Sequence, residues 1–137
     1  MIYVLDACAM IAYLRSEPGA NAVETALIEA ILDPATECFA HAVNLCEVYY
    51  DFYRAGGEPA ASGALTDLQD VGVIERNDFD QTFWQDAGRL KAQGKVSLAD
   101  CFALVLTNSV GGALLTSDHH ELDRIAALGT HNIAFIR

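Results

Sequence analysis

Positive charge is scarce in this sequence. Only eight residues are Lys or Arg against 19 Asp and Glu, which gives a formal net charge of −11. Binding to nucleic acid is driven largely by Lys and Arg, so the overall charge by itself argues against a nucleic-acid ligand. A basic protein partner would suit this charge. The argument against nucleic acid weakens if several carboxylates surround divalent cations, because the ions reverse the local field.

The sequence also lacks a long apolar segment. No uninterrupted apolar run reaches the roughly 18 residues that a membrane-spanning helix needs. The N-terminus lacks the basic start of a secretory signal. Hydrophobic residues still make up 53% of the 137 residues, enough for the core of a single domain over residues 1–137. We therefore expect a soluble, cytoplasmic protein without a membrane contact.

The usual sequence patterns of soft-metal sites are absent. The four cysteines form no C-x-x-C pair, and the four histidines show no H-E-x-x-H pattern. The apolar sequence surroundings of the cysteines favour reduced thiols in the core over disulfides or a zinc site. These cysteines are Cys8, Cys38, Cys46 and Cys101.

Short apolar runs alternate with helical patterns along the whole chain. Strands are predicted at Ile2–Leu5, Glu37–Ala40, Val71–Glu75, Ala113–Thr116 and Ile133–Ile136. Helices are predicted at Ala7–Leu14, Ser16–Leu32, His41–Arg54, Pro59–Asp70, Asp78–Gln93, Ser97–Ser109 and His119–Leu128. This alternation predicts a parallel sheet with helices on both faces.

Three carboxylates stand alone in the most apolar segments. Asp6, Glu47 and Asp100 are each the only charged side chain of a long segment that we expect to be buried. Buried acids without partners raise one another's pKa and destabilise a fold, and a shared divalent cation removes that cost. The simpler interpretations are a helix N-cap for Asp6 and a solvated helix flank for Glu47. For Asp100 the simpler interpretation is a capping box with Ser97.

A fourth acid repeats the setting of the first. Asp118 follows the strand Ala113–Thr116 and opens a helix, as Asp6 does after the first strand. Capping together with Glu121, three residues later, is its simpler interpretation. In an open parallel sheet both acids would lie at the carboxyl ends of strands, where ligand sites form. Four acids at strand ends and helix starts favour a cluster over four independent caps.

Ligands that are all oxygen indicate a hard cation, Mg²⁺ or Mn²⁺. Such an ion lowers the pKa of a bound water and neutralises charge on a phosphodiester, so we infer metal-assisted phosphodiester hydrolysis. Candidate donors around the acids are Thr116, Ser117 and Asn44. Asn44 precedes Glu47 by three residues and therefore shares its helix face.

At this point the sequence resembles a PIN domain of the VapC type, the toxins of prokaryotic toxin–antitoxin pairs. The resemblance rests on four short motifs in the family's order, and it covers essentially the whole chain. They read V-L-D-A-C-A-M-I-A-Y-L, N-L-C-E-V-Y-Y, S-L-A-D-C-F-A-L and L-L-T-S-D-H-H-E-L. One position departs from the family, which often has Ser or Thr where Cys8 stands, so a weak hydrogen-bond donor replaces a good one.

The resemblance implies a three-layer α/β/α sandwich with a mainly parallel five-stranded sheet. It implies an endoribonuclease that depends on Mg²⁺ or Mn²⁺, with Thr116 as the hydroxyl residue near the metal. The family's catalytic, metal-binding acids fall on Asp6, Glu47, Asp100 and Asp118.

The resemblance also implies an RNA substrate, a cognate antitoxin whose tail occupies the active-site groove, and a homodimer. Candidates for either protein interface, unless they pack in the core, are Tyr49, Tyr50, Phe52 and Tyr53. Candidate RNA contacts are Arg15, Lys91 and Lys95, and also Arg54 and Arg89.

The sequence alone leaves two other functions open. The first is a magnesium-dependent phosphotransfer domain of the haloacid-dehalogenase or receiver type, which also has an acid after its first strand. The haloacid-dehalogenase type needs a second Asp at the position of Cys8. The receiver type needs adjacent acids near the first strand and a lysine late in the sheet, and neither is present here. The second is a catalytically inactive PIN-like module that binds protein, against which the intact acids argue.

Overall fold

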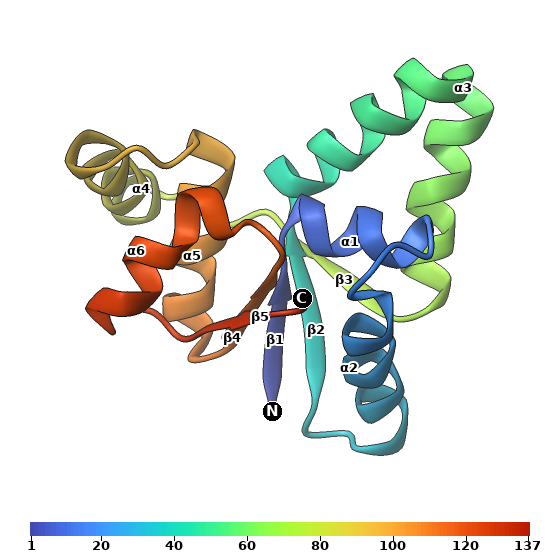
Figure 1. The fold of residues 1–137 in the computed structure, drawn as a ribbon, viewed down its shortest axis with the longest axis horizontal. Helices are drawn as coiled ribbons and strands as arrows, with labels where there is room; N and C mark the ends of the chain where they lie inside the picture. The colour runs from blue at the N-terminus through green and yellow to red at the C-terminus, as the bar shows by residue number, and fades with distance from the viewer.

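The computed structural model describes residues 1–137 and contains one five-stranded sheet (Figure 1). All paired strands are parallel, and their order is β3-β2-β1-β4-β5. The strands are β1 (Ile2–Leu5), β2 (Glu37–His41), β3 (Val73–Arg76), β4 (Ala113–Thr116) and β5 (Ile133–Phe135). The helices are α1 (Ala7–Leu14), α2 (Ala20–Leu32), α3 (Ala42–Asp70), α4 (Gln81–Gln93), α5 (Leu98–Val110) and α6 (His119–Leu128). The predicted α/β/α sandwich is confirmed.

Each face of the sheet has its own core. Helices α1, α2 and α3 cover one face, and α4, α5 and α6 cover the other (Figure 1). Successive residues of the central strand β1 point to opposite faces, so Leu5 enters the first core and Val4 the second. Val4 is in register with Phe39 of β2 and Leu114 of β4. Burial on both faces explains why these strands read as continuous apolar runs.

Glycines and N-caps set the element boundaries that differ from prediction. Helix α2 begins at Ala20, later than Glu17 and Pro18 suggest, because Gly19 has φ 97° at its N-cap. A side chain at Gly19 would also meet Ile136, whose Cγ1 lies 2.8 Å from the Cβ position.

The two helices predicted at His41–Arg54 and Pro59–Asp70 are the two arms of α3. They join at a kink where Gly56 and Gly57 leave helical geometry. The next strand begins two residues later than predicted, at Val73 instead of Val71.

Some residues expected in the core lie at the surface. Cys8 and Cys46 are exposed, whereas Cys38 and Cys101 are buried, and all four are free thiols. None of the helices combines the length and the apolarity that a membrane crossing needs.

Candidate metal centre

The four predicted acids are carried by elements that meet at the carboxyl edge of the sheet. Asp6 directly follows β1, and Asp118 lies two residues beyond the end of the neighbouring strand β4. Asp100 lies in the first turn of α5, and Glu47 lies near the start of α3. Because β1 and β4 are paired in parallel, two acids far apart in sequence leave the sheet at adjacent points.

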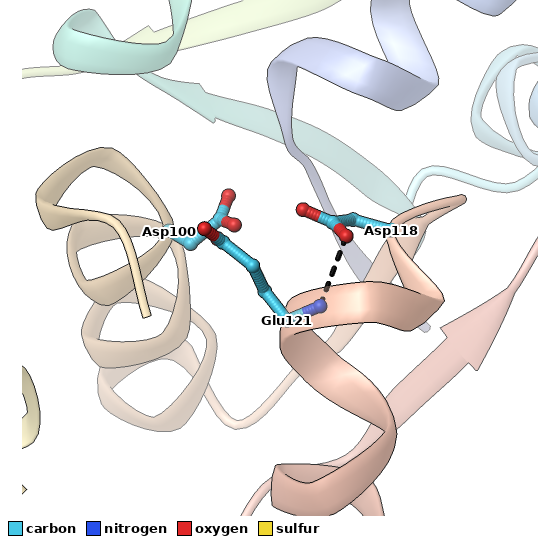
Figure 2. A group of neighbouring side chains, drawn as sticks. All are labelled: Asp100, Asp118 and Glu121. Carbon is cyan, nitrogen blue, oxygen red and sulfur yellow. Dashed lines mark hydrogen bonds between the residues drawn. The ribbon is translucent and has the colours of Figure 1, made fainter. Parts of the chain in front are cut away.

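Three carboxylates come within ligand distance of one another. One oxygen from each of Asp100, Asp118 and Glu121 lies within 4.8 Å of the others. Figure 2 shows Asp100 on α5 and Glu121 on α6 pointing toward each other, with Asp118 facing the same space. The backbone N–H of Glu121 also donates to Asp118 Oδ1 at 3.1 Å, so Asp118 is the N-cap that its simpler interpretation predicted.

Only one of the two hydrogen bonds of the predicted capping box joins Ser97 and Asp100, and Glu121 supplies the acceptor of the other. Ser97 Oγ accepts from the backbone N–H of Asp100 at 3.2 Å, as such a box requires. The reciprocal bond differs, because the Ser97 N–H donates to Glu121 Oε2 at 3.2 Å. The carboxylate of Asp100 is thus not needed as a cap, and it faces Glu121 and Asp118.

The two carboxylate oxygens of Asp6 have different surroundings: one caps a helix, and the other has no hydrogen-bond partner. The residue is completely buried. Its Oδ1 accepts from the backbone N–H of Ala9 at 2.9 Å and caps α1. Its Oδ2 is buried and has no hydrogen-bond partner. A buried carboxylate oxygen without a donor is costly, and a cation would supply the missing partner.

Burial and mutual repulsion raise the pKa values of Asp6 and Asp100. Burial raises the pKa of Asp6 to about 7, and the charges of Asp118 and Glu47 add to this effect. Burial also raises the pKa of Asp100 to about 9, helped by its hydrogen bond with Glu121. The same contact lowers the pKa of Glu121 below its ordinary value.

Cys8 lies near enough to all four predicted acids for each of their charges to act on its thiol. It is exposed in the first turn of α1, two residues after Asp6. Loss of hydration raises the pKa of its thiol to about 12, and the negative charge of each predicted acid adds to the rise.

Glu47 is half-buried at the border of the cluster, where Asn44 holds it. Asn44 is fully buried, and its Nδ2 donates to Glu47 Oε1 and to the carbonyl of Ala99, each at 3.3 Å. The second bond ties α3 to the first turn of α5. Burial raises the pKa of Glu47, while Asn44 and the Tyr50 hydroxyl oppose that rise.

The two predicted hydroxyl donors differ in role. Thr116 is buried, and its Oγ1 accepts from the backbone N–H of Asp118 at 3.0 Å, which fixes the start of α6. Ser117 is half-buried and contributes only its carbonyl, which accepts from the His119 N–H. No side-chain hydrogen bond joins Ser117 to the acids, so the structure does not show the predicted donor role.

The predicted RNA contacts are not equally available. Arg15 pairs with Asp51 at 2.8 Å, so its charge is already neutralised. Lys91 is exposed, and its Nζ donates to the carbonyl of Val96 at 3.0 Å. Lys95 is exposed and makes no ion pair.

The PIN domain family matches residues 3–128 of this sequence. The chain belongs to the PIN-domain family. This membership confirms the family resemblance and sets aside the haloacid-dehalogenase and receiver alternatives.

Solved structures of similar fold include VapBC-1 from nontypeable Haemophilus influenzae (TM-score 0.70, 17% identity), which covers 99% of this chain and 98% of that one. VapBC2 from Rickettsia felis, bound to a DNA fragment from its promoter, has a TM-score of 0.72 at 14% identity, covering 98% of each chain. VapC20 of Mycobacterium tuberculosis, described as a sarcin–ricin loop cleaving toxin, has a TM-score of 0.61 at 15% identity. It covers 83% of this chain and 87% of that one. At these identities the likeness concerns the fold. No curated protein matches the chain in sequence.

The residues of this PIN domain fit a hard divalent cation. The donor set consists of carboxylates alone, which is the chemistry that Mg²⁺ and Mn²⁺ prefer. No cationic side chain neutralises the predicted acids, because none of the chain's ion pairs involves them. The unpartnered Asp6 Oδ2 is the strongest indication, since no protein donor makes a hydrogen bond with it. Only the Thr116 hydroxyl and the capping N–H of Ala9 oppose the rise in the pKa of this acid.

Glu121 is the member of the acidic cluster that the sequence did not predict. It was considered only as a capping companion of Asp118, and its backbone does play that part. Its side chain instead crosses to α5 and meets Ser97 and Asp100. The available signal was an acid three residues after Asp118, on the first turn of a helix that opens at the site.

Proposed function

We propose that this PIN domain is an endoribonuclease that depends on a divalent cation and acts as the toxin of a type II toxin–antitoxin pair. The observation that carries the proposal is Asp6 Oδ2, a buried oxygen without a partner in a group of acids that no base neutralises. Such an arrangement does not stabilise a fold, but an enzyme that binds a cation needs it.

Mg²⁺ or Mn²⁺ would be held by Asp6, Asp100 and Asp118, with Glu47 and Glu121 at the margin. When bound, the ion lowers the pKa of a water and neutralises charge on the phosphodiester. The chain positions these ligands through the N-terminal turns of α1, α5 and α6.

Glu47 is suited to a proton-transfer role. Asn44 holds its Oε1, and burial raises the pKa of Glu47 above its ordinary value, which makes this carboxylate a better proton acceptor. We infer that its other oxygen takes up a proton from the attacking water.

The proposed substrate and partner draw support from proteins of the same fold. VapC20 is described as cleaving the sarcin–ricin loop, and the VapBC structures are toxin–antitoxin assemblies. The net charge of −11 suits a basic antitoxin segment. The family resemblance also favours a homodimer for this chain. RNA and antitoxin would both meet this protein in the cytoplasm.

The test is cleavage of mixed RNA by the purified protein with Mg²⁺ or Mn²⁺ and with EDTA. We expect cleavage only with the ion, and its loss in Asp100→Asn purified in parallel. Asp78→Asn is the matched control, because Asp78 is paired with Arg76 away from the site. Cleavage in EDTA, or full activity of Asp100→Asn, would overturn the mechanism. A wild-type protein that binds an antitoxin but cleaves no RNA would support the inactive binding module instead.

A further inference from the structure

An aromatic ring and a cation lie together on α3 beside Glu47. Tyr50 is three residues after Glu47, so its backbone lies about 4.5 Å further along the helix axis. The residue is 42% exposed. The guanidinium carbon of Arg54 lies 4.7 Å from the centre of the Tyr50 ring, a cation–π contact.

The tyrosine shares a helix face with one of the acids. Tyr50 and Glu47 are three residues apart on α3, a spacing that makes side chains neighbours on a helix surface. Glu47 in turn is linked through Asn44 to the first turn of α5, which carries Asp100. The exposed ring therefore borders the proposed reaction centre.

Arg54 differs from the other arginines of this region in having a free charge. Arg15 is paired with Asp51, and Arg76 is paired with Asp78. Arg54 is exposed and makes no ion pair with a carboxylate. The face of α3 that leads away from Glu47 thus offers a flat ring and an available cation in a strongly acidic protein.

We propose that Tyr50 and Arg54 form a stacking platform for one unpaired nucleobase of the RNA substrate, beside the phosphodiester to be cleaved. This inference rests on the proposed ribonuclease function. Aromatic rings bind bases of single-stranded RNA by stacking, without a large positive field. An enzyme with few cations gains affinity in this way, and the platform selects single-stranded RNA over duplex because only an unpaired base can reach the ring.

The inference is tested by RNA binding without cleavage. A fluorescein-labelled single-stranded oligoribonucleotide of mixed sequence is titrated with protein in EDTA, and the dissociation constant is read from fluorescence anisotropy. Tyr50→Leu keeps an apolar side chain without a stacking face, and we expect it to weaken binding roughly tenfold. Tyr50→Phe keeps the ring and should bind as the wild type does. Arg54→Ala should weaken binding by a smaller factor.

Tyr53→Leu is the matched control. Tyr53 is on the same helix and is 51% exposed, but it lies one turn further from Glu47 and stacks on Tyr49 at 6.0 Å. It should bind as the wild type does. With Mg²⁺ present, Tyr50→Leu should raise KM by the same factor as it weakens binding, and its kcat should equal that of Tyr50→Phe, which also lacks the hydroxyl. Circular dichroism melts establish that each variant is folded.

The outcomes separate the two proposals. If the wild type cleaves RNA and Tyr50→Leu keeps wild-type affinity and KM, the platform is wrong and the ribonuclease function stands. If Tyr50→Leu keeps its RNA affinity but changes the oligomeric state in gel filtration, this face is a protein contact, which also overturns the platform. If the wild type cleaves no RNA with either ion, the proposed function fails and the platform fails with it.

Discussion

Carboxylates in two regions of this molecule have opposite surroundings. Where β3 leads toward α4, Asp78 accepts two hydrogen bonds from Arg76, each 2.9 Å long, and they hold its pKa below the ordinary value. At the carboxyl edge of β1 and β4, Asp6 and Asp100 have no basic partner, and their pKa values are raised. The same type of side chain is stabilised from within the chain in one region and lacks that stabilisation in the other.

The contrast shows where the chain retains an arrangement that costs stability. Asp78 and Arg76 are both partly exposed, so their pairing contributes at most about 1 kcal/mol. Asp6 has no such compensation, because it is completely buried with one oxygen unpartnered. Unfavourable local arrangements of this kind are typical of functional sites.

The largest difference between the two regions should appear in catalysis. Asp6→Asn or Asp100→Asn should lower the RNA cleavage rate by at least about 100-fold, the upper range for residues that only support a metal ligand. Asp78→Asn should leave the rate close to wild type. Initial rates on one RNA substrate with saturating Mg²⁺ measure the difference. Equal losses in all three variants would remove the distinction between the regions.

Stability should depend on pH in opposite senses in the two regions. The folded state binds protons at Asp6 and Asp100 more tightly than the unfolded chain does. Their contribution is therefore fully present below about pH 4 and is lost as pH rises through about 7 and then about 9. For Asp6, the change from 3.8 to about 7 corresponds to on the order of 4 kcal/mol. Asp78, whose pKa is lowered, contributes above its ordinary pKa and loses that contribution in acid.

Urea unfolding of the metal-free protein at pH 5 and pH 8 measures this effect. We expect a lower free energy of unfolding at pH 8, a smaller fall in Asp6→Asn, and recovery of the wild type on addition of Mg²⁺. Equal falls in the wild type and Asp6→Asn, with no recovery, would contradict the account.

Removing Glu121 should weaken the cation site without destroying it. In Glu121→Ala the Ser97 N–H loses its acceptor, and the Asp100 carboxylate is free to turn back and cap it. We expect Mn²⁺ affinity, measured by calorimetry, to fall about tenfold or more. Glu121→Gln keeps an acceptor for Ser97 and should lose less. Wild-type affinity in Glu121→Ala would show that Asp100 needs no help from α6.

The smallest effect should come from the paired region. Arg76→Met removes the partner of Asp78 from a partly exposed pair, so the free energy of unfolding should fall by about 1 kcal/mol or less. RNA cleavage should not change. Thermal denaturation and cleavage assays on the same preparation provide both values, and a large loss of cleavage would link the two regions.

Much of the architecture could be predicted from sequence because local signals are strong in this chain. Continuous apolar runs predicted the strands, and Gly56-Gly57 predicted the break in α3. The isolated positions of Asp6 and Asp100 predicted acids at one edge of the sheet, where the structure has them. What the sequence did not contain was strand order, which places β1 beside β4.

The remaining features depend on contacts between distant segments. Glu121 belongs to the site through the reach of its side chain from α6 to α5, which no local pattern encodes. Arg15 was a candidate RNA contact, but its charge is paired with Asp51, which lies on a different helix. Cys8 reads as a core residue in its apolar segment, yet the first turn of α1 opens onto the site and exposes it.

The most direct test of the cation site is a crystal structure after soaking with Mn²⁺, with anomalous difference maps. We predict a peak between Asp6 Oδ2 and the carboxylates of Asp100 and Asp118, with metal–oxygen distances of about 2.1 Å. A map with no peak at these acids, or with the ion bound only elsewhere on the surface, would contradict the claim that they are arranged to hold a cation.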